Sequence, residues 1–259
     1  MSVESAALVY FSPTGTTKAV LSKIGEGLAS KLHHIDITTE DRENIVVDDS
    51  LAIIGIPVYA GRIPPVAVQR LKRLSGTCPC VCVAVYGNRE VDDALLELKN
   101  LVTERGFKMI AAGSFIGQHS FNTAERPLAD GRPDSSDDAL AVNFGEGIAA
   151  KLARNDLSEP AVPGNFPYKP NGPSLGGAPV TVADSCDLCG ECEASCPTHA
   201  IKITDGVVVT QPDECIGCFA CVQACPTDAR VFPATERLEK VRQWLFDTCK
   251  ARKEPVTYI

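Results

Sequence analysis

The chain has 259 residues, which is enough for one large domain or two ordinary ones, because domains typically run to about 100–200 residues. Apolar residues make up 44% of the sequence, a share that predicts a globular protein with a buried core and argues against a disordered chain. The net charge of −8 argues against nucleic-acid binding, because the phosphates of DNA and RNA are held by basic surfaces.

The start of the chain lacks the basic region and the long apolar region of a secretory signal, and Glu4 interrupts the approach to the first apolar run. No stretch reaches the roughly 18–20 consecutive apolar residues of a membrane-spanning helix. We therefore expect a cytoplasmic protein with no membrane span. In such a reducing compartment, twelve cysteines indicate metal binding rather than a disulfide framework.

The first predicted elements enclose a loop rich in hydroxyl groups. Residues 6–11 are an apolar run suited to a buried strand, and residues 17–32 carry apolar residues at helical spacing. A short loop that leads from a strand to a helix N-terminus favours an anion, because the amides and the helix dipole point at it. The loop has neither the Walker sequence nor the glycine pattern of dinucleotide sites, so ATP and NAD are disfavoured.

This loop, Ser12-Pro13-Thr14-Gly15-Thr16-Thr17, resembles the phosphate loop of flavodoxins, which holds FMN without a cationic side chain. An ordinary strand-to-helix turn capped by threonine is the alternative. The resemblance implies that the following residues bind the FMN phosphate: Ser12, Thr14, Gly15, Thr16 and Thr17.

Strands and helices continue to alternate, as a doubly wound α/β sheet requires. Such a sheet, with five parallel strands in the order 2-1-3-4-5, would bind its ligand at the carboxyl ends of strands 1, 3 and 4. The further strands are expected at about 34–37, 51–56, 81–86 and 108–115, and the helices at about 66–74, 92–105 and 136–153.

The loops after the third and fourth strands, 57–65 and 86–92, each carry a tyrosine, a glycine and polar groups suited to a flavin ring. The sequences of these loops resemble the flavodoxin-like half of flavodoxin–ferredoxin fusion proteins of anaerobes, and that resemblance extends over nearly the whole chain. It implies Gly61 as the flexible peptide whose carbonyl meets the flavin N5. The implied ring-binding residues are Pro57, Val58, Tyr59, Ala60, Gly61, Tyr86, Gly87, Asn88 and Asp92.

The chain departs from many flavodoxins in its aromatic residues. The only tryptophan, Trp244, lies far away near the C-terminus, and Val91 stands where an aromatic residue is expected. We therefore expect the ring to be stacked on one side, with a face open to a donor, acceptor or substrate. Ordinary packing at strand ends is the alternative interpretation of Tyr59 and Tyr86.

Several other residues allow both a structural and a functional interpretation. The thiols at 78, 80 and 82 alternate along one strand and lie on one face of the sheet, where packing is favoured over metal binding. His119 follows the fifth strand and is either a proton donor to the flavin or a surface or capping histidine. Arg62 and Arg89 either oppose an anionic ring or the acidic cysteine-rich half, or are solvated.

The predicted linker, residues 156–179, is rich in proline and glycine and reads as an extended tether. It separates a flavodoxin-like domain at 1–155 from a cysteine-rich domain at 180–233. Within the latter, small strands are expected at 179–183, 201–210 and 230–232, with a turn at Asp205-Gly206. Residues 234–259 complete the chain as a helix and tail that pack back onto one of the domains.

Eight cysteines form a duplicated pattern, C-x₂-C-x₂-C-x₃-C-P, whose second copy follows after 29 residues. This is the spacing of bacterial two-cluster ferredoxins, in which three thiolates wrap one [4Fe–4S] cluster and the fourth serves the other. Zinc is disfavoured, because a structural zinc takes four ligands from two Cys-x₂-Cys pairs. The predicted ligands are Cys186, Cys189, Cys192 and Cys225 for cluster one, and Cys215, Cys218, Cys221 and Cys196 for cluster two.

The close resemblance of this segment to bacterial dicluster ferredoxins covers about 180–233. Eight acidic side chains stand against two basic ones between residues 181 and 233, so low-potential clusters are expected. The leading hypothesis is an electron relay between FMN, two [4Fe–4S] clusters and a redox-protein partner, with no acid–base or nucleophilic residue. The alternatives are a flavin-dependent reductase of a small substrate, fed through the clusters, and a redox or iron sensor.

Overall fold

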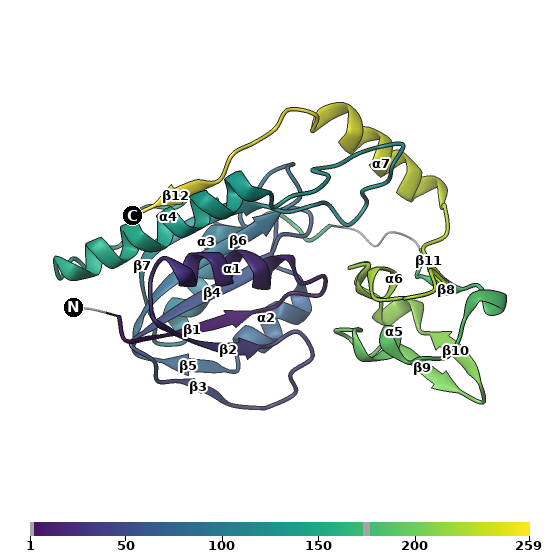
Figure 1. Ribbon diagram of the computed structural model, residues 1–259, viewed down its shortest axis with the longest axis horizontal. Helices are drawn as coiled ribbons and strands as arrows, with labels where there is room; N and C mark the ends of the chain where they lie inside the picture. Colours follow the sequence, from purple (N-terminus) through teal and green to yellow (C-terminus); the bar gives the residue numbers. More distant parts are fainter. Residues whose placement is uncertain (1–2, 173–176) are drawn as a thin grey trace.

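The computed structural model describes residues 3–172 and 177–259, so residues 173–176 of the predicted linker and residues 1–2 of the predicted first domain lie outside the described residues. Within this part of the chain the main sheet has six strands in the order β12-β7-β6-β4-β1-β2 (Figure 1). All of its neighbouring strands are parallel except β12 and β7. The strands are β1 (Ser5–Tyr10), β2 (Lys31–Asp36), β4 (Leu51–Pro57), β6 (Pro79–Tyr86), β7 (Lys108–Ile116) and β12 (Val256–Tyr258).

The five parallel strands have the predicted order 2-1-3-4-5 when they are numbered along the chain. Helices α1 (Thr16–Glu26) and α4 (Ser135–Ala153) cover one face of the sheet, and α2 (Pro65–Leu71) and α3 (Ala94–Glu104) cover the other. Because both faces are covered, the central strands are apolar along almost their whole length. We call these elements, from β1 to α4 together with β12, the sheet domain.

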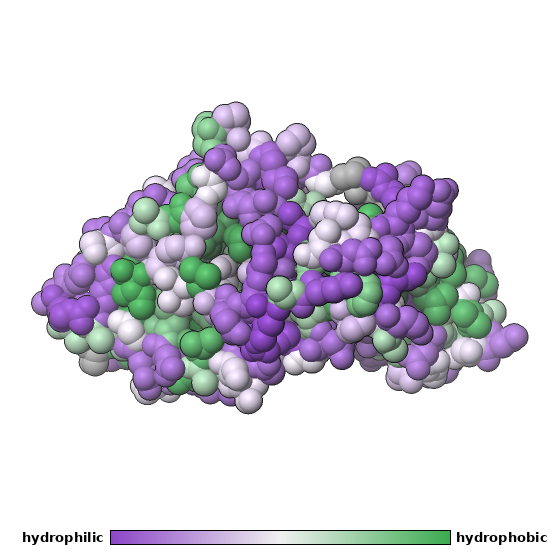
Figure 2. Space-filling view, turned by 90° about the horizontal axis from the view of Figure 1, so that it is seen from above, coloured by the Kyte–Doolittle hydropathy of each residue, from purple (hydrophilic) through white to green (hydrophobic). Residues whose placement is uncertain are grey.

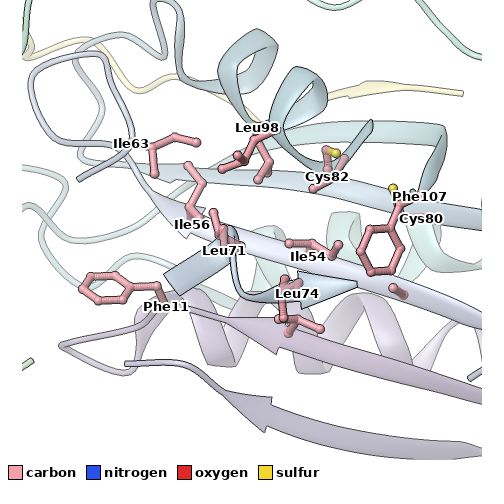
Figure 3. Close-up of a cluster of buried hydrophobic side chains, with 14 of the residues drawn as sticks. Phe11, Ile54, Ile56, Ile63, Leu71, Leu74, Cys80, Cys82, Leu98 and Phe107 are labelled. Atoms are coloured by element: carbon pink, nitrogen blue, oxygen red, sulfur yellow. The ribbon is translucent and has the colours of Figure 1, made fainter. Parts of the chain in front are cut away.

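The predicted packing role of the strand cysteines agrees with the core. Cys80 and Cys82 are fully buried on the face that α2 and α3 cover, among Ile54, Leu98 and Phe107 (Figure 3). Cys78 lies at the margin of the same core cluster. Burial raises the pKa of the Cys78 thiol to about 11, as expected for a thiol that packs as a small apolar group.

Two sequence-based boundaries were wrong. The first helix ends at Glu26 instead of continuing to residue 32, and β2 already begins at Lys31. Gly27 follows the helix where a Cβ atom would lie 2.1 Å from the carbonyl oxygen of Val142 in α4, so close helix packing requires glycine at this end.

Other differences concern short strands. The sequence analysis missed β3 (Ile45–Val47) and β5 (Leu74–Gly76), which form a separate parallel pair, and it missed β12. Each has three residues, which is too short for an apolar period to be recognised.

The cysteine domain extends from β8 (Val180–Thr181) to β11 (Arg230–Val231), which pair with each other. Each cysteine run contains a one-turn helix, α5 (Glu191–Ala194) or α6 (Ala220–Gln223), which carries the third cysteine of the run. Between the runs, β9 (Ile201–Thr204) and β10 (Val207–Thr210) form a hairpin. Its turn residues Asp205 and Gly206 have positive φ angles, as a tight Asp-Gly hairpin turn requires.

The C-terminal segment returns from the cysteine domain to the sheet domain (Figure 1). Helix α7 (Glu236–Thr248) is capped by Thr235, whose hydroxyl accepts a hydrogen bond from the Leu238 amide at 3.2 Å. The chain then runs to β12, which pairs with the edge strand β7. Among the described residues, every helix is too short or too polar to span a lipid bilayer.

Candidate redox cofactor sites

The eight cysteines of the duplicated pattern line two different cavities in the cysteine domain. The first cavity is lined by Cys186, Cys189, Cys192 and Cys225. The second cavity is lined by Cys196, Cys215, Cys218 and Cys221. In each set, three thiols come from one half of the repeat and the fourth from the other half.

The chemistry of both cavities fits an iron–sulfur cluster. Burial raises the pKa of Cys218 to about 12 and also raises the pKa values of Cys192, Cys215 and Cys221. Buried thiols ionise when cations are bound beside them, and cluster iron supplies that charge. Within residues 3–172 and 177–259, no three His, Cys, Asp or Glu side chains converge closely enough for a single ion, so each thiol set surrounds a volume instead of a point.

The loop between β1 and α1 presents amide and hydroxyl groups. Gly15 is exposed with φ 80°, a left-handed conformation, and the space where its Cβ would lie is open. The hydroxyls of Thr14 and Thr16 lie 3.4 Å apart. The first amides of a helix have no partner inside the helix, so this loop suits a phosphate group.

Two predicted phosphate ligands also have structural contacts. The Ser12 hydroxyl accepts a hydrogen bond from the Lys18 amide at 3.1 Å, and the Ser12 amide donates to the Thr38 hydroxyl. Thr17 is buried, and its methyl group faces Gly55 in β4. Thr17 is therefore available to a ligand through its main chain.

After β4, residues Tyr59 to Arg62 form a tight turn closed by two main-chain hydrogen bonds between its end residues. The central residues Ala60 and Gly61 have φ angles of 52° and 86°. Before the turn, the Val58 amide donates to the carbonyl of Val85 at 2.8 Å. The two predicted ring loops thus begin side by side at the carboxyl edge of the sheet.

The structure brings Gly87 and His119 together at the same edge. A Cβ atom at Gly87 would lie 2.4 Å from the His119 ring, so glycine is needed for this approach. The Nδ1 atom of His119 accepts a hydrogen bond from the Phe121 amide at 3.0 Å. Burial lowers the pKa of His119 to about 4, which keeps its ring neutral near pH 7. Burial raises the pKa of Tyr86 to about 12.

Other predicted ring residues have side chains engaged elsewhere. The Asn88 side chain donates to the carbonyls of Cys249 and Ala251, at 2.8 and 2.9 Å, and accepts from the Lys253 amide. The Asp92 carboxylate accepts from Lys169 of the predicted linker at 2.9 Å, and also from Arg89. These two side chains hold chain segments over the ring loops.

The arginines are partnered as well. Arg62 forms a hydrogen-bonded ion pair with Glu97 at 2.7 Å and lies 4.8 Å from the centre of the Tyr168 ring in the predicted linker. Arg62 therefore fastens the linker to the loop after β4. Arg89 is paired with Asp92.

The second cavity faces the sheet domain. Pro197, Ile216 and Phe219 line this cavity, and each directly follows one of its cysteines. The Pro197 carbonyl accepts a hydrogen bond from buried Arg70 at 2.6 Å, and Ile216 packs against the core of the sheet domain.

Aromatic rings continue this interface. The Phe219 ring lies 5.3 Å from that of Phe121, which follows β7, and 4.8 Å from that of Phe232. Tyr59 lies near Cys218 and Cys215, and burial, with a smaller contribution from these thiols, raises its pKa well above the usual range. The segment that carries Phe121 was expected near the flavin or the cysteine-rich domain, and its ring does contact that domain. The sequence analysis missed Arg70, Ile216 and Phe219, because nothing local marks a residue as a contact between domains.

Comparison with protein families identifies the cysteine domain. A family model described as a 4Fe-4S dicluster domain matches residues 185–229. No curated protein matches the chain.

Several solved structures resemble the N-terminal part of the chain. A flavodoxin from the domain Archaea is 15% identical and aligns 57% of this chain with 99% of that one, at a TM-score of 0.42. Oxidised flavodoxin 1 from Bacillus cereus is 14% identical over 57% of this chain and 98% of that one, at a TM-score of 0.39. A short-chain flavodoxin associated with a non-canonical PDU bacterial microcompartment is 15% identical over 59% of this chain and 99% of that one, at a TM-score of 0.41.

The protein therefore joins a doubly wound, flavodoxin-like sheet to a dicluster ferredoxin domain. This architecture is that of a redox protein that transfers electrons. The fold assignment of the first half rests on its strand order, 2-1-3-4-5, and that of the second on the duplicated cysteine pattern. Residues 185–229 match the 4Fe-4S dicluster family, and the sheet domain that precedes them has the strand order of a flavodoxin-like fold.

Proposed function

We propose that this protein relays electrons between FMN, two [4Fe–4S] clusters and an external redox protein. One observation supports the proposed order of electron transfer. Pro197, Ile216 and Phe219 contact the sheet domain, and all three line the second cavity. The relay is then flavin, cluster two, cluster one and partner.

In this proposal cluster one binds Cys186, Cys189, Cys192 and Cys225, and cluster two binds Cys196, Cys215, Cys218 and Cys221. The FMN phosphate binds at residues 12–17, where exposed Gly15 and the neighbouring hydroxyls of Thr14 and Thr16 support it. The ring lies between residues 57–61 and 86–88. Asn88 and Asp92 contribute by holding these loops, since their side chains are bonded to the tail and the linker. FMN supplies exchange of one or two electrons, and each cluster supplies exchange of one.

The outer end of the relay is the exposed side of the first cavity. Leu188 and Cys189 are exposed there, and Leu188 adopts a left-handed conformation with φ 59°. Gly217 occupies the corresponding position of the second half, so this position carries an apolar side chain only in the first half. The neighbouring Asp184, Asp187 and Glu191 are exposed, which favours a partner with a basic surface.

In Figure 2 apolar atoms lie on the surface over the sheet domain and also at the end of the molecule that the cysteine domain forms. Exposed valines contribute to this apolar surface of the domain: Val180, Val182, Val207, Val209 and Val231.

The test compares two ligand variants in the full chain, purified without oxygen. The wild-type protein is expected to contain about eight irons and one FMN. Cys218→Ala should disable cluster two and so stop electron transfer from photoreduced flavin to cluster one. Cys189→Ala should leave transfer from flavin to cluster two intact but slow the reduction of added cytochrome c, a basic redox protein. Equal behaviour of the two variants, or a wild-type protein without flavin, would contradict the proposal.

A further inference from the structure

The two halves of the cysteine domain differ in charge at one buried position. The repeat of 29 residues makes Ile201 of the first half equivalent to Arg230 of the second. Both residues are 2% exposed. Ile201 lines the second cavity, whereas Arg230 lines the first. A guanidinium group therefore occupies the position at which the other half has hydrocarbon.

The positive charge of Arg230 is held by neutral oxygen atoms. Its Nη1 donates to the Thr181 hydroxyl at 2.6 Å, and its Nη2 donates to the Pro179 carbonyl and the Thr210 hydroxyl, each at 2.9 Å. The Nε atom is buried and has no hydrogen-bond partner in the described part of the chain. A buried cation with this surrounding is costly unless negative charge lies nearby, and thiolate-bound clusters provide it.

Arg230 also reaches the ligand set of the other cavity. Its Nη2 lies 3.9 Å from the Sγ of Cys221, which lines the second cavity. Arg230 lines the first cavity together with Cys192. One guanidinium thus acts on thiols of both sets.

We propose that the positive charge of Arg230 makes both clusters easier to reduce. The inference rests on the two clusters of the proposed function. Reduction moves one electron from dithionite to a cluster core, from the 2+ to the 1+ state, without making or breaking a bond to the protein. A nearby buried cation stabilises the added negative charge, because the interior screens it less than water does.

The experiment is a reductive titration of the full chain, with the cluster signals followed by electron paramagnetic resonance. Arg230→Gln removes the charge but keeps polar atoms, Arg230→Ile copies the other half, and Arg230→Lys keeps the charge. The first two should lower the reduction equilibrium constant about tenfold, which is about 59 mV for one electron. Arg230→Lys should stay close to the wild-type value. Lys202→Met is the matched control, because it removes an exposed charge that water and salt already screen.

A wild-type midpoint in Arg230→Gln with full iron content would overturn the inference, as would equal shifts in the Gln and Lys variants. If Arg230→Ile loads no iron, the Gln and Lys pair decides the question. The titration reads the clusters directly, so a failure of electron exchange with flavin would overturn the proposed relay and leave the role of Arg230 standing.

Discussion

Single residues explain why the loops at the carboxyl edge of the sheet keep their shape. Ala60 has a positive φ that costs energy for a side chain, whereas Gly61 meets the same requirement without strain. A Cβ at Gly61 would lie 2.1 Å from the Asp92 carboxylate, so this glycine also allows the two ring loops to touch. The Gly61 carbonyl accepts from the Asp93 amide at 3.1 Å, and any movement of this peptide must break that bond.

His119 leads to a pH prediction. Its pKa falls from about 6.5 in an unfolded chain to about 4 in the folded one, mainly through burial. Below pH 6.5 the unfolded chain binds a proton that the folded chain does not, so stability falls as the pH drops from about 6.5 towards 4. At pH 5.5 the loss should be about 1 kcal/mol relative to pH 7.5.

The measurement is urea unfolding of the sheet domain within the full chain at both pH values. His119→Asn keeps an acceptor for the Phe121 amide but does not titrate, so its free energy of unfolding should change less with pH. An equal pH dependence in the two proteins would refute the assignment.

At the scale of elements, the two one-turn helices of the cysteine domain begin differently. Helix α5 is preceded by Gly190 at φ 85°, which glycine adopts freely. Helix α6 is preceded by Phe219 at φ 64°, a conformation that strains a bulky side chain. The strained residue is the one whose ring contacts Phe121 of the sheet domain. The two halves of the cysteine domain thus have the same backbone conformation at this position. They differ in side chain, because only the second half contacts the sheet domain here.

Replacing Phe219 with glycine should relieve this strain and remove the aromatic contacts, which are worth about 1 kcal/mol. We expect normal iron content but a several-fold slower electron transfer from photoreduced flavin to the clusters. Leu188→Gly is the control, because it relieves a similar strain at φ 59° beside the first cavity without touching this contact. Flash photolysis gives both rates, and identical rates in the two variants would show that the Phe219 ring does not couple the domains.

At the scale of the molecule, the cysteine domain is fastened to the sheet domain from both of its ends. On the N-terminal side, Asp93 accepts hydrogen bonds from the amides of Asn165 and Lys169, so much of the predicted tether is docked instead of free. On the C-terminal side, Asn88 holds residues 249–253, and β12 adds to the sheet. This double attachment keeps the second cavity against the carboxyl edge of the sheet.

Asn88→Gly should release the tail. Glycine tolerates the φ of 63° at this position, so the change removes the three side-chain hydrogen bonds alone, at a cost of about 2–3 kcal/mol. We expect faster amide hydrogen exchange in residues 253–258. Asn155→Gly is the matched control, since Asn155 also has a positive φ, of 55°, but is exposed. Unchanged exchange in Asn88→Gly would mean that the tail is held by β12 alone.

The sequence by itself determined the two folds. Apolar runs of five or more residues, such as 51–56, mark buried strands, and their alternation with helices permits a doubly wound sheet. The repeat at Cys186 and Cys215 predicted which thiols share a cavity, because cysteine spacing is a local property of the chain. The hydroxyl-rich loop at 12–17 is likewise a local feature of the sequence, so the prediction of a phosphate site there needs no tertiary information.

Tertiary structure alone decided how the halves meet. The edge strand β12, the bonds of Asn88 to the tail and the contact of Phe219 with Phe121 all join residues more than 90 positions apart. The sequence shows an apolar, aromatic or amide side chain at each of these positions, but it does not show which residue that side chain contacts. Such contacts depend on how completed domains pack, and no periodicity or spacing within a short segment encodes that packing.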